Sequence, residues 1–483
     1  MNVLHAASEC FPLVKTGGLA DVIGALPPAL RALGCDARVV LPGYRGLRER
    51  LAPVRTLGTL SAHGRELQLL RGTLGELPVY LVADAGLYER DGDPYRDAGG
   101  AEFADNALRF ACFAQAVAAL GRGFDADYVP DVVNLHDWQA ALAAPWLRSA
   151  SPRPALVYTI HNLAYQGQFE RAQYEALGLP DAWWTPDGLE FWGRWSCMKA
   201  GIVYSDAIST VSPSYAREIQ TPEYGHGLDG VLRWRAAALH GIANGIDTAV
   251  WDPRRDPLIE RHYGVDDVAP GKAANKYLLQ TELGLASGDW PLVVFIGRLA
   301  EQKGADLIVA AQDELLQLPA QYALLASGDA ELQRRLQDFA ARAPAGRVAL
   351  RIAHDERFAH RLNAAADLVL MPSRFEPCGL NQMYAQRYGA IPVVRRTGGL
   401  IDTVVDADAA SLADGSASGV LFNDADADGL LYGVRRALQL YEQADTRARL
   451  RRAGMTRDFS WSASAQSYLA LYRGLAAAGD TTR

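Results

Sequence analysis

Short apolar runs of strand length alternate with longer helical patterns along the whole chain. In the first half, the runs are NVLHAA, ARVVLP, VYLVA, VVNLH, LVYTIH and AISTVS, and the helical patterns include residues 21–33 and 106–120. In the second half, the runs are LVVFIG, ALLAS, VALRIA, LVLMPS and IPVVR, again with helical patterns between them. This alternation is typical of parallel sheets that helices cover on both faces. The sequence therefore predicts the α/β class.

The length of the chain indicates more than one domain. At 483 residues it exceeds the size at which a single hydrophobic core stops growing. The segment NGIDTAVWDPRRDP, residues 244–257, interrupts the pattern with Gly, Pro and clustered charge. We therefore expect two doubly wound domains, at residues 1–245 and 246–455. Residues 456–483 are predicted to form an amphipathic helix, WSASAQSYLALYRGL, followed by a short polar tail, GDTTR.

Composition and charge exclude several function classes. The chain is 49% hydrophobic and 22% charged, which is typical of folded globular proteins and excludes wholesale disorder and fibrous architecture. Its net charge of -8 repels a polyanion, so we expect no nucleic-acid partner. A small anionic substrate stays compatible with this charge, because a few local cations and backbone N–H groups can bind a phosphate.

The cysteines and the longest apolar stretches bear on cellular location. The 5 cysteines are Cys10, Cys35, Cys112, Cys197 and Cys378. They are odd in number, far apart and without a CxxC pair, which favours a reducing cytosol. The N-terminus has no basic start before an apolar core, and no apolar stretch approaches the roughly 20 residues of a membrane helix. We therefore expect a soluble cytoplasmic protein with no membrane partner.

Polar residues follow the predicted strands of the first half, where ligands bind in doubly wound sheets. They are Lys15 with Gly17 and Gly18, His136 with Asp137, His161 with Asn162, and Asn244. A cation, imidazoles, a carboxylate and amides suit a polyhydroxylated ligand, and the two glycines let the backbone approach an anion closely. The alternative interpretation is that these residues form ordinary turns and helix caps.

In the second half, two cations follow the run LVVFIG. Arg298 stands at the end of this predicted strand, and Lys303 stands just before a predicted helix. A guanidinium fork and an ammonium group, five positions apart, suit a diphosphate whose charge must be neutralised as it departs. The alternative is a pair of solvated surface cations.

A carboxylate closes another predicted strand in the segment PSRFEPCGL. Glu376 ends this strand, and Pro377 is expected to be the first residue of a helix that continues through Arg387. The backbone N–H groups of Cys378, Gly379 and Leu380 would then lie near the carboxylate. Such a turn could bind sugar hydroxyls and phosphate together, whereas the alternative is a simple carboxylate cap.

Motifs for other chemistry are absent or incomplete. GxGxxG and GxxxxGK[ST] do not occur, which disfavours nicotinamide, flavin and P-loop nucleotides, and no GxSxG indicates a hydrolase. DADADG, residues 424–429, resembles a calcium loop but has Arg435 in place of the required Glu, so we expect a helix start there. The DxD triplets at Asp91, Asp125 and Asp406 are expected to lie in solvated loops. The sequence predicts neither a metal nor a cofactor.

Six segments taken together resemble bacterial glycogen synthases and plant starch synthases. They are KTGGLADV at residues 15–22, HDW at 136–138, TIHNLAYQG at 159–167, the segment 298–304, PSRFEPCGL at 372–380 and VRRTGGLIDTV at 394–404. They span almost the whole chain in order, and KTGGLADV, HNLAYQG and EPCGL together are highly specific for this family. TGGL occurs in two of the segments, which indicates that both halves use Gly-Gly turns. The resemblance implies a GT-B fold, with two Rossmann-like domains that face each other across a deep cleft and a C-terminal helix that crosses back to the first domain.

The resemblance also implies the reaction and the residues that perform it. The reaction is retaining transfer of glucose from a nucleotide sugar, usually ADP-glucose in bacteria, to the nonreducing end of an α-1,4-glucan such as glycogen, without a metal. By position, Lys15 and Gly18 contact the donor phosphates, and Arg298 and Lys303 stabilise the leaving diphosphate. Asp137, His161 and Asn244 contact the transferred glucose, and Gly17 and Asn162 belong to the same donor site. Glu376 is similar to the essential acidic residue, Cys378, Gly379 and Leu380 line the donor site beside it, and Tyr95 borders the acceptor channel.

Two positions depart from the family pattern and bear on the donor nucleotide. His354 stands where bacterial relatives often carry a Tyr that stacks on adenine, and Asn381 replaces a Thr after EPCGL. A His can stack and an Asn can hydrogen-bond, so both remain donor-binding candidates, and UDP-glucose is the alternative donor. The competing functions are a GT-B transferase with a lipid or small-sugar acceptor, a noncatalytic glucan-binding protein, and a Rossmann dehydrogenase.

Overall fold

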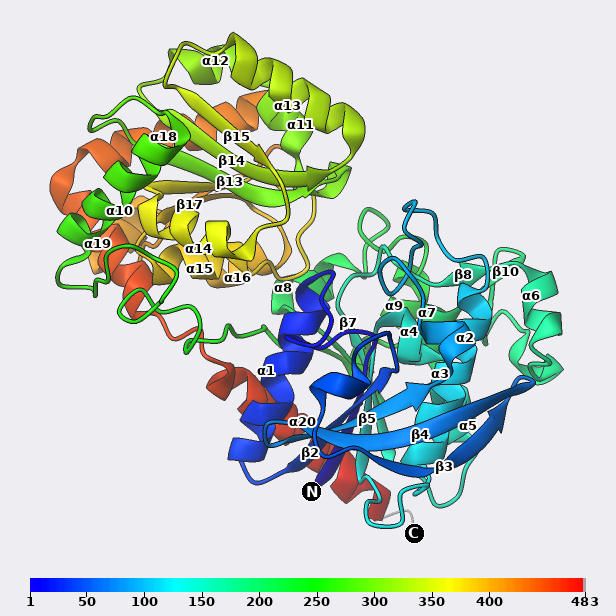
Figure 1. Cartoon of the computed structure of the whole chain (residues 1–483). Helices are drawn as coiled ribbons and strands as arrows, with labels where there is room; N and C mark the ends of the chain where they lie inside the picture. The colour runs from blue at the N-terminus through cyan, green and yellow to red at the C-terminus, as the bar shows by residue number, and fades with distance from the viewer. Residues whose placement is uncertain (481–483) are drawn as a thin grey trace. The chain divides into compact units, whose positions relative to one another are not determined.

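The computed structural model describes residues 1–480 and divides into two compact units (Figure 1). The first unit comprises Met1–Gly245 together with the C-terminal segment from Trp461 onwards, and the second comprises Ile246–Ser460. Helix α20 (Trp461–Asp480) therefore belongs to the first unit. The predicted polar tail begins inside this helix, and its last residues, 481–483, lie outside the described part of the chain.

A sheet of 9 strands forms the centre of the first unit, in the order β12-β11-β7-β6-β1-β2-β5-β4-β3. The strands are β1 (Asn2–Ala6), β2 (Asp36–Pro42), β3 (Arg55–Ala62), β4 (Arg65–Leu74), β5 (Leu77–Ala83), β6 (Val132–His136), β7 (Ala155–Ile160), β11 (Ala207–Thr210) and β12 (Leu239–Gly241). From β1 the chain moves outward through β2 and then returns to the other side of β1 with β6. The boundary between β1 and β6 is therefore the topological switch point of this sheet.

Helices pack on the parallel part of the first sheet. They include α1 (Gly18–Ala32), α3 (Asn106–Gly121), α4 (Asp137–Ala141), α5 (Ala143–Arg148), α7 (Cys197–Tyr204), α8 (Pro213–Glu218) and α9 (Asp229–Trp234). Helices α1 and α20 pack together, and their apolar side chains share a buried cluster with Val3, Val132 and Val157 of the sheet. The smaller elements are α2 (Ala85–Tyr88), α6 (Arg171–Ala176) and a short sheet of β8 (Gln168–Phe169), β10 (Arg194–Ser196) and β9 (Glu190–Phe191).

The second unit contains a sheet of 6 parallel strands in the order β15-β14-β13-β16-β17-β18. They are β13 (Leu292–Leu299), β14 (Gln321–Gly328), β15 (Val348–Ile352), β16 (Leu368–Met371), β17 (Ile391–Arg395) and β18 (Val420–Phe422). Val293 and Phe295 belong to one buried cluster, and Leu292 and Val294 belong to another. Because successive strand residues point to opposite faces, the sheet is buried on both sides. Its switch point lies between β13 and β16.

Helices surround the second sheet. They are α10 (Val268–Leu283), α11 (Ala305–Ala310), α12 (Gln312–Gln317), α13 (Ala330–Arg342), α14 (Glu356–Ala365), α15 (Asn381–Arg387), α16 (Gly398–Thr403), α17 (Ala409–Asp414), α18 (Ala427–Glu442) and α19 (Ala444–Thr456). Asp426 caps α18 by accepting a hydrogen bond from Gly429 N, which confirms the predicted helix start at DADADG. None of the helices within residues 1–480 has the length and apolar character needed to cross a membrane.

The observed sheets confirm the predicted α/β class, but one edge departs from parallel pairing. Strands β3, β4 and β5 pair antiparallel. The loop from β3 to β4 has only His63 and Gly64, both with positive φ (48° and 72°), which is the geometry of a two-residue hairpin turn. Such a short turn can join only antiparallel neighbours. The prediction of parallel pairing throughout is therefore wrong at this edge.

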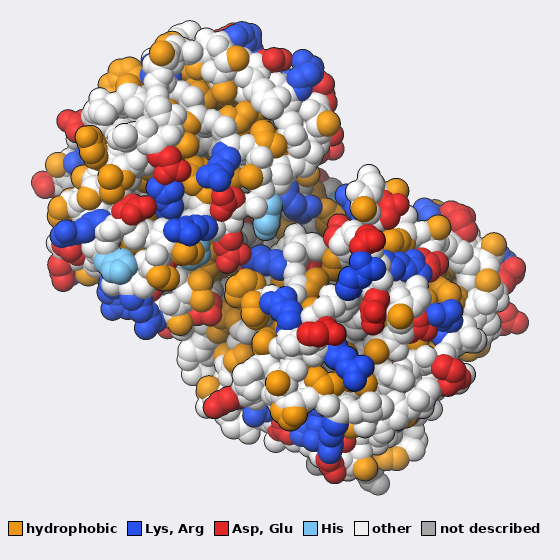
Figure 2. All heavy atoms as spheres, viewed as in Figure 1, with side chains coloured by type: hydrophobic (Ala, Val, Ile, Leu, Met, Phe, Trp, Pro, Cys, Tyr) orange, Lys and Arg blue, Asp and Glu red, His pale blue; other side chains and the backbone are white. Residues whose placement is uncertain are grey.

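Charged side chains of both signs cover the surface. Figure 2 shows Lys and Arg side chains interspersed with Asp and Glu side chains over the visible face of each unit. This mixture is consistent with the sequence, in which 56 acidic residues slightly outnumber 48 basic ones. No single sign of charge dominates the face drawn.

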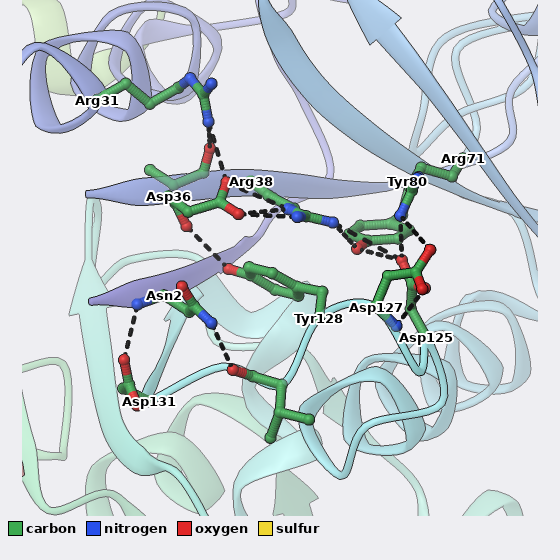
Figure 3. A network of polar contacts seen from close by, with 12 residues as sticks. Asn2, Arg31, Asp36, Arg38, Arg71, Tyr80, Asp125, Asp127, Tyr128 and Asp131 are labelled. Carbon is green, nitrogen blue, oxygen red and sulfur yellow. Dashed lines mark hydrogen bonds and ion pairs between the residues drawn. The ribbon is translucent and has the colours of Figure 1, made fainter. Parts of the chain in front are cut away.

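A polar network ties the amino ends of β1 and β2 to β4 and β5 (Figure 3). At its centre Asp125, which is only 4% exposed, accepts hydrogen bonds of 2.8 Å from both Arg71 and Tyr80. Arg38 lies over the Tyr128 ring, donates to Tyr80 and pairs with Asp36. The expectation that the triplet at Asp125 is a solvated loop is therefore wrong. Asp406 is also ion-paired, with Arg396 and Arg436, whereas Asp91 is exposed and pairs with Arg45 at the surface.

Removal of the Asp125 carboxylate should destabilise the first unit. Burial alone would raise the pKa of Asp125, but hydrogen bonds from Tyr80 and Arg71 hold this pKa below its ordinary value. The contribution to stability is therefore present at neutral pH and is lost as the pH falls. We expect Asp125→Ala to lower the free energy of unfolding by about 3 kcal/mol, because it leaves buried donors unpaired. Denaturant titration measures this change.

Asp127→Ala is the matched control for this variant. The Asp127 side chain is 65% exposed and pairs with Arg55 at the surface. We expect its removal to cost less than about 1 kcal/mol. Equal losses in the two variants would contradict the central role of Asp125.

Candidate active site

Polar side chains gather at the switch point of the first sheet, where β1 and β6 end. Glu9 follows β1 by three residues and is buried, with 3% of its surface exposed. Its Oε2 accepts hydrogen bonds from the backbone N–H of Thr16 at 2.5 Å and of Gly17 at 3.1 Å. Its Oε1 accepts from the hydroxyl groups of Thr16 and Tyr95. Glu9 therefore fixes the shape of the KTGG loop.

Lys15 lies in the same loop and is paired within it. Its ammonium group donates to Asp21 Oδ1 at 2.8 Å and lies over the Phe11 ring at 5.3 Å. Asp21 is in the first turn of α1, and Gly18 is the first residue of that helix. Gly17 is extended, with open space where a side chain would lie. The structure thus places Lys15, Gly17 and Gly18 together at the start of a helix.

Asp137 occupies a left-handed conformation directly after β6, with φ of 54°. Its carboxylate accepts a hydrogen bond of 2.8 Å from the backbone N–H of His161, and another from the N–H of Asn162. Burial raises the pKa of Asp137 to about 7, although these two amide hydrogen bonds act in the opposite direction. The ends of β6 and β7 are therefore joined through one carboxylate of unusually high pKa.

The remaining candidates of the first unit differ in their surroundings. The His161 imidazole is buried and hydrogen-bonded through Nε2 to His136 at 2.9 Å. Asn244 is 8% exposed, and its Oδ1 is buried and accepts no hydrogen bond from any described residue. The Tyr95 hydroxyl is hydrogen-bonded to Glu9 and, at 2.8 Å, to Ser8. An unpaired amide oxygen can accept a hydrogen bond from a ligand hydroxyl.

A cation and a carboxylate meet at the switch point of the second sheet. Lys303, which follows β13, donates to Glu376 Oε2 at 2.5 Å, and Glu376 follows β16. Ser373 donates to the same oxygen at 3.0 Å, and Glu376 is only 4% exposed. Arg298 is exposed in β13, one residue before the strand ends. The structure thus brings Lys303 and Glu376 into direct contact.

The helix predicted from Pro377 to Arg387 begins later than expected. Gly379 has a left-handed φ of 68°, and α15 starts only at Asn381. The side chain of Gln382 folds back and donates to the carbonyl oxygens of Cys378 at 3.0 Å and Gly379 at 2.9 Å. The prediction of a helix start at Pro377 is therefore wrong, because the left-handed glycine forms a turn before the helix.

The second TGGL segment packs directly on this turn. The backbone N–H of Gly399 donates to the Glu376 carbonyl oxygen at 3.0 Å. A Cβ atom at Gly399 would lie 2.3 Å from the Cys378 carbonyl oxygen, so only glycine fits. Cys378 is 5% exposed and lies against this glycine. Helices begin inside both TGGL copies, α1 at Gly18 and α16 at Gly398. The Cβ position of Gly399 is enclosed by the Cys378 turn, whereas that of Gly17 is open.

The positions that depart from the family pattern lie near this turn or at another strand end. Asn381 is the first residue of α15; its Oδ1 accepts from Asn363, and its buried Nδ2 finds no acceptor among the described residues. His354 is exposed in the loop between β15 and α14. Within residues 1–480, no group of three or more His, Cys, Asp or Glu side chains is placed to hold a metal ion.

Comparison with known proteins accounts for both units. A family model described as starch synthase catalytic domain matches residues 2–234, and one described as glycosyl transferases group 1 matches residues 284–457. A protein named glycogen synthase 2 from Nitrosococcus oceani is 46% identical over 98% of this chain and 97% of its own length. The chain belongs to the glycogen synthase family. A glycogen synthase from Thioalkalivibrio sulfidiphilus is 48% identical, with 98% of this chain and 100% of that protein covered.

Solved structures agree with this membership. The catalytic domain of starch synthase IV from Arabidopsis thaliana, bound to ADP and acarbose, matches with a TM-score of 0.89 and 34% identity, covering 99% of each chain. Sucrose-phosphate synthase from Thermosynechococcus elongatus matches with a TM-score of 0.61 and 20% identity, covering 99% of each chain, and supports the fold alone. Family membership confirms the GT-B fold class and identifies the chain as a glycosyltransferase of the glycogen synthase family.

Sequence reasoning missed the residues that hold the predicted ones in place. Glu9, Asp21 and Ser373 contact the KTGG loop, Lys15 and Glu376, respectively. The signal for Asp21 was its place in the first turn of a helix next to a cation. Glu9 and Ser373 were missed although their partners Gly17 and Glu376 lie in the same loops, because the letters of a loop do not show how it folds back on itself.

One glycine from each TGGL copy provides a pair of variants whose surroundings differ: the Cβ position is enclosed at Gly399 and open at Gly17. We expect Gly399→Ala to lower the free energy of unfolding by about 1–3 kcal/mol, because the new methyl group would collide with the Cys378 backbone. Gly17→Ala should leave thermal stability nearly unchanged, because no atom lies within 4 Å of its Cβ position. Calorimetry of both variants measures the difference. A larger loss for Gly17→Ala would contradict the packing described.

The raised pKa of Asp137 should be visible in stability against pH. The folded pKa exceeds the unfolded one, so the folded state binds more protons between the two values, and stability falls as the pH rises toward about 7. Asp137→Asn removes this titration while keeping an oxygen that accepts from an amide. We expect the difference in unfolding free energy between the variant and wild type to favour the variant more at about pH 8 than at about pH 5. A pH-independent difference in melting temperature would contradict the raised pKa.

Proposed function

We propose that this glycogen synthase family member transfers glucose from ADP-glucose to the nonreducing end of an α-1,4-glucan, with retention of configuration and release of ADP. The observation that carries the proposal is the contact between Lys303 and Glu376 at the switch point of the second sheet. Ligands bind at such points in doubly wound sheets, and this one presents a cation beside a buried carboxylate. A sugar diphosphate needs both groups.

The second unit supplies groups for the leaving diphosphate. Breaking the bond between the sugar and the phosphate places negative charge on the diphosphate and positive charge on the sugar. Lys303 and Arg298 stabilise the first charge, and the Glu376 carboxylate stabilises the second. The Glu376 turn, with Cys378, Gly379, Leu380 and Asn381, contributes backbone and amide groups to donor binding. The buried, unpaired Asn381 Nδ2 supports this assignment.

The first unit supplies groups for the sugar and for further phosphate contacts. Lys15, Gly17 and Gly18 contact the donor phosphates at the start of α1, where backbone N–H groups are available. Asp137, His161, Asn162 and Asn244 contact the transferred glucose, and Tyr95 contacts the acceptor glucan. The unpaired Asn244 Oδ1 supports a hydroxyl partner at that position.

Retention of configuration follows from attack on the same face that the diphosphate leaves. The bond from the anomeric carbon to the diphosphate oxygen breaks, and the acceptor hydroxyl forms its bond within the resulting ion pair. The proton of that hydroxyl passes to the departing diphosphate. The described groups contribute charge stabilisation rather than a covalent nucleophile.

The donor nucleotide and the location complete the proposal. His354 stacks on the base, and ADP-glucose is the donor, with UDP-glucose as the alternative. The ADP in the solved starch synthase IV structure favours the adenine nucleotide. We place the enzyme in the cytoplasm, because all five cysteines are free and buried.

Transfer of labelled glucose into glycogen tests the proposal, with ADP-glucose and UDP-glucose compared. We expect incorporation from ADP-glucose and a decrease of at least about 100-fold in kcat for Glu376→Ala, which removes the charge opposite the developing cation. Glu314→Ala, at an exposed position in α12, is the matched control. Incorporation only from UDP-glucose would overturn the nucleotide assignment. No incorporation from either donor would overturn the reaction in favour of a noncatalytic glucan-binding protein or another acceptor.

A further inference from the structure

Three histidine rings form a continuous hydrogen-bonded chain across adjacent strands of the first sheet. His5 lies in β1, His136 ends β6 and His161 follows β7, and these strands are neighbours in the order β7-β6-β1. His5 Nδ1 lies 3.0 Å from His136 Nε2, and His136 Nδ1 lies 2.9 Å from His161 Nε2. This hydrogen-bonded chain thus runs from the core to the candidate site. It uses Nε2 of His161, so Nδ1 of this ring is left for other partners.

All three rings are neutral near pH 7. His5 and His136 are fully buried, and His161 is 9% exposed. Burial lowers the pKa of His5 and of His161 to about 3 and lowers that of His136 well below its ordinary value. A neutral imidazole carries one N–H and one bare nitrogen. Each ring therefore donates at one nitrogen and accepts at the other.

Neutral rings in this geometry allow only two arrangements of protons. In the first, His5 donates to His136, His136 donates to His161, and His161 carries its proton on Nδ1. In the second, every direction is reversed, so that His161 carries its proton on Nε2 and His5 carries its proton on its own Nε2. The protonation of any one ring thus determines that of the other two.

The inner end of the chain favours the first arrangement. His5 Nε2 is buried and has no hydrogen-bond partner among the described residues. In the second arrangement this nitrogen would be a buried N–H without an acceptor, which is rare in folded proteins. In the first arrangement it is only a bare lone pair.

The outer end of the chain favours the same arrangement. The Asp137 carboxylate lies against the His161 backbone, where it accepts the 2.8 Å hydrogen bond from His161 N. In the first arrangement all three N–H dipoles point from His5 toward this end of the chain. Above about pH 7, where Asp137 is ionised, its negative charge stabilises dipoles of that direction. Hydrogen bonds aligned in one chain also strengthen one another.

We propose that His5 and His136 are positioning residues that keep the proton of His161 on Nδ1, so that His161 acts as a hydrogen-bond donor to an oxygen of the donor sugar. The sugar contact rests on the proposed function, whereas the proton position does not. A hydroxyl oxygen bound in this way has its own proton free for another acceptor, which fixes the orientation of the sugar.

Heteronuclear NMR of the full-length, unliganded enzyme tests the proton position directly. The protein is labelled at its histidine ring nitrogens, and single histidine substitutions assign the signals. We expect all three rings to be neutral, each with a protonated Nδ1 and a bare Nε2. A bare Nδ1 on His161, or rapid exchange between the two forms, would overturn the proposal. Because no substrate is present, this result is independent of whether the enzyme transfers glucose.

Two variants of His136 separate positioning from simple packing. His136→Asn retains an N–H donor at the place of Nδ1, whereas His136→Leu has a similar volume and no donor. We expect His136→Leu, which removes the hydrogen bonds to both His5 and His161, to lower kcat/KM for the donor at least about tenfold, and His136→Asn to lose less. NMR should show a protonated His161 Nδ1 in the Asn variant. Equal kinetic losses with an unchanged His161 signal in both variants would overturn the proposal.

Discussion

Burial of the parallel strands on two faces is the constraint on which the rest of the structure depends. A parallel strand enclosed by helices accepts a polar side chain along its length only where that side chain is paired, as His5 in β1 and Asn134 in β6 are, and its backbone groups are already paired within the sheet. Groups that must meet a ligand therefore stand where strands end. The structure follows this rule in both units: Glu9 and Asp137 come after β1 and β6, and Lys303 and Glu376 come after β13 and β16. Each pair lies at the point where the strand order reverses, because helices diverge there and leave space above the sheet.

Loops that carry these groups are held by backbone contacts rather than by their own sequence preferences. Glu9 binds two amide groups of the KTGG loop, and Gly399 binds the carbonyl oxygen of Glu376. In the second case the contact exists only because glycine has no side chain, since Cys378 occupies the space. The Glu9 carboxylate and Gly399 thus serve the same purpose. Each holds a loop that carries a charged side chain, Lys15 in the first case and Glu376 in the second, at a place where no helix or strand supports that loop.

The local pattern of the sequence located most of the parallel strands of both sheets, together with helices α1 and α3, but it did not indicate β3, β4, β12 or β18. Runs such as VVNLH and LVVFIG are apolar because they are buried on both faces, and this cause is visible in the sequence itself. The antiparallel edge and the late start of α15 were not predictable in this way, because they depend on turns with positive φ, at His63 and Gly64 for the edge and at Gly379 for α15. His5 also escaped, since its role arises from strand order, which places β1 beside β6. Glu9 escaped because its role depends on how its own loop folds back onto the KTGG segment. Asp137, His161, Lys303 and Glu376 were found because they directly follow apolar runs, but their partners were not.

The C-terminal helix bears on how the protein is made. Trp461, Tyr468 and Tyr472 share a buried cluster with Val3, and Tyr472 hydrogen-bonds Asn134 in the central sheet. The first unit thus takes part of its core from a segment that is synthesised after the whole second unit, which is one continuous stretch of chain. Although domains usually fold in the order of their synthesis, the unit begun first here can be completed only after the second has been made. Its apolar surface on β1, β6 and β7 stays uncovered until α20 has been synthesised, so this is the stage at which a chaperone would have the most to protect.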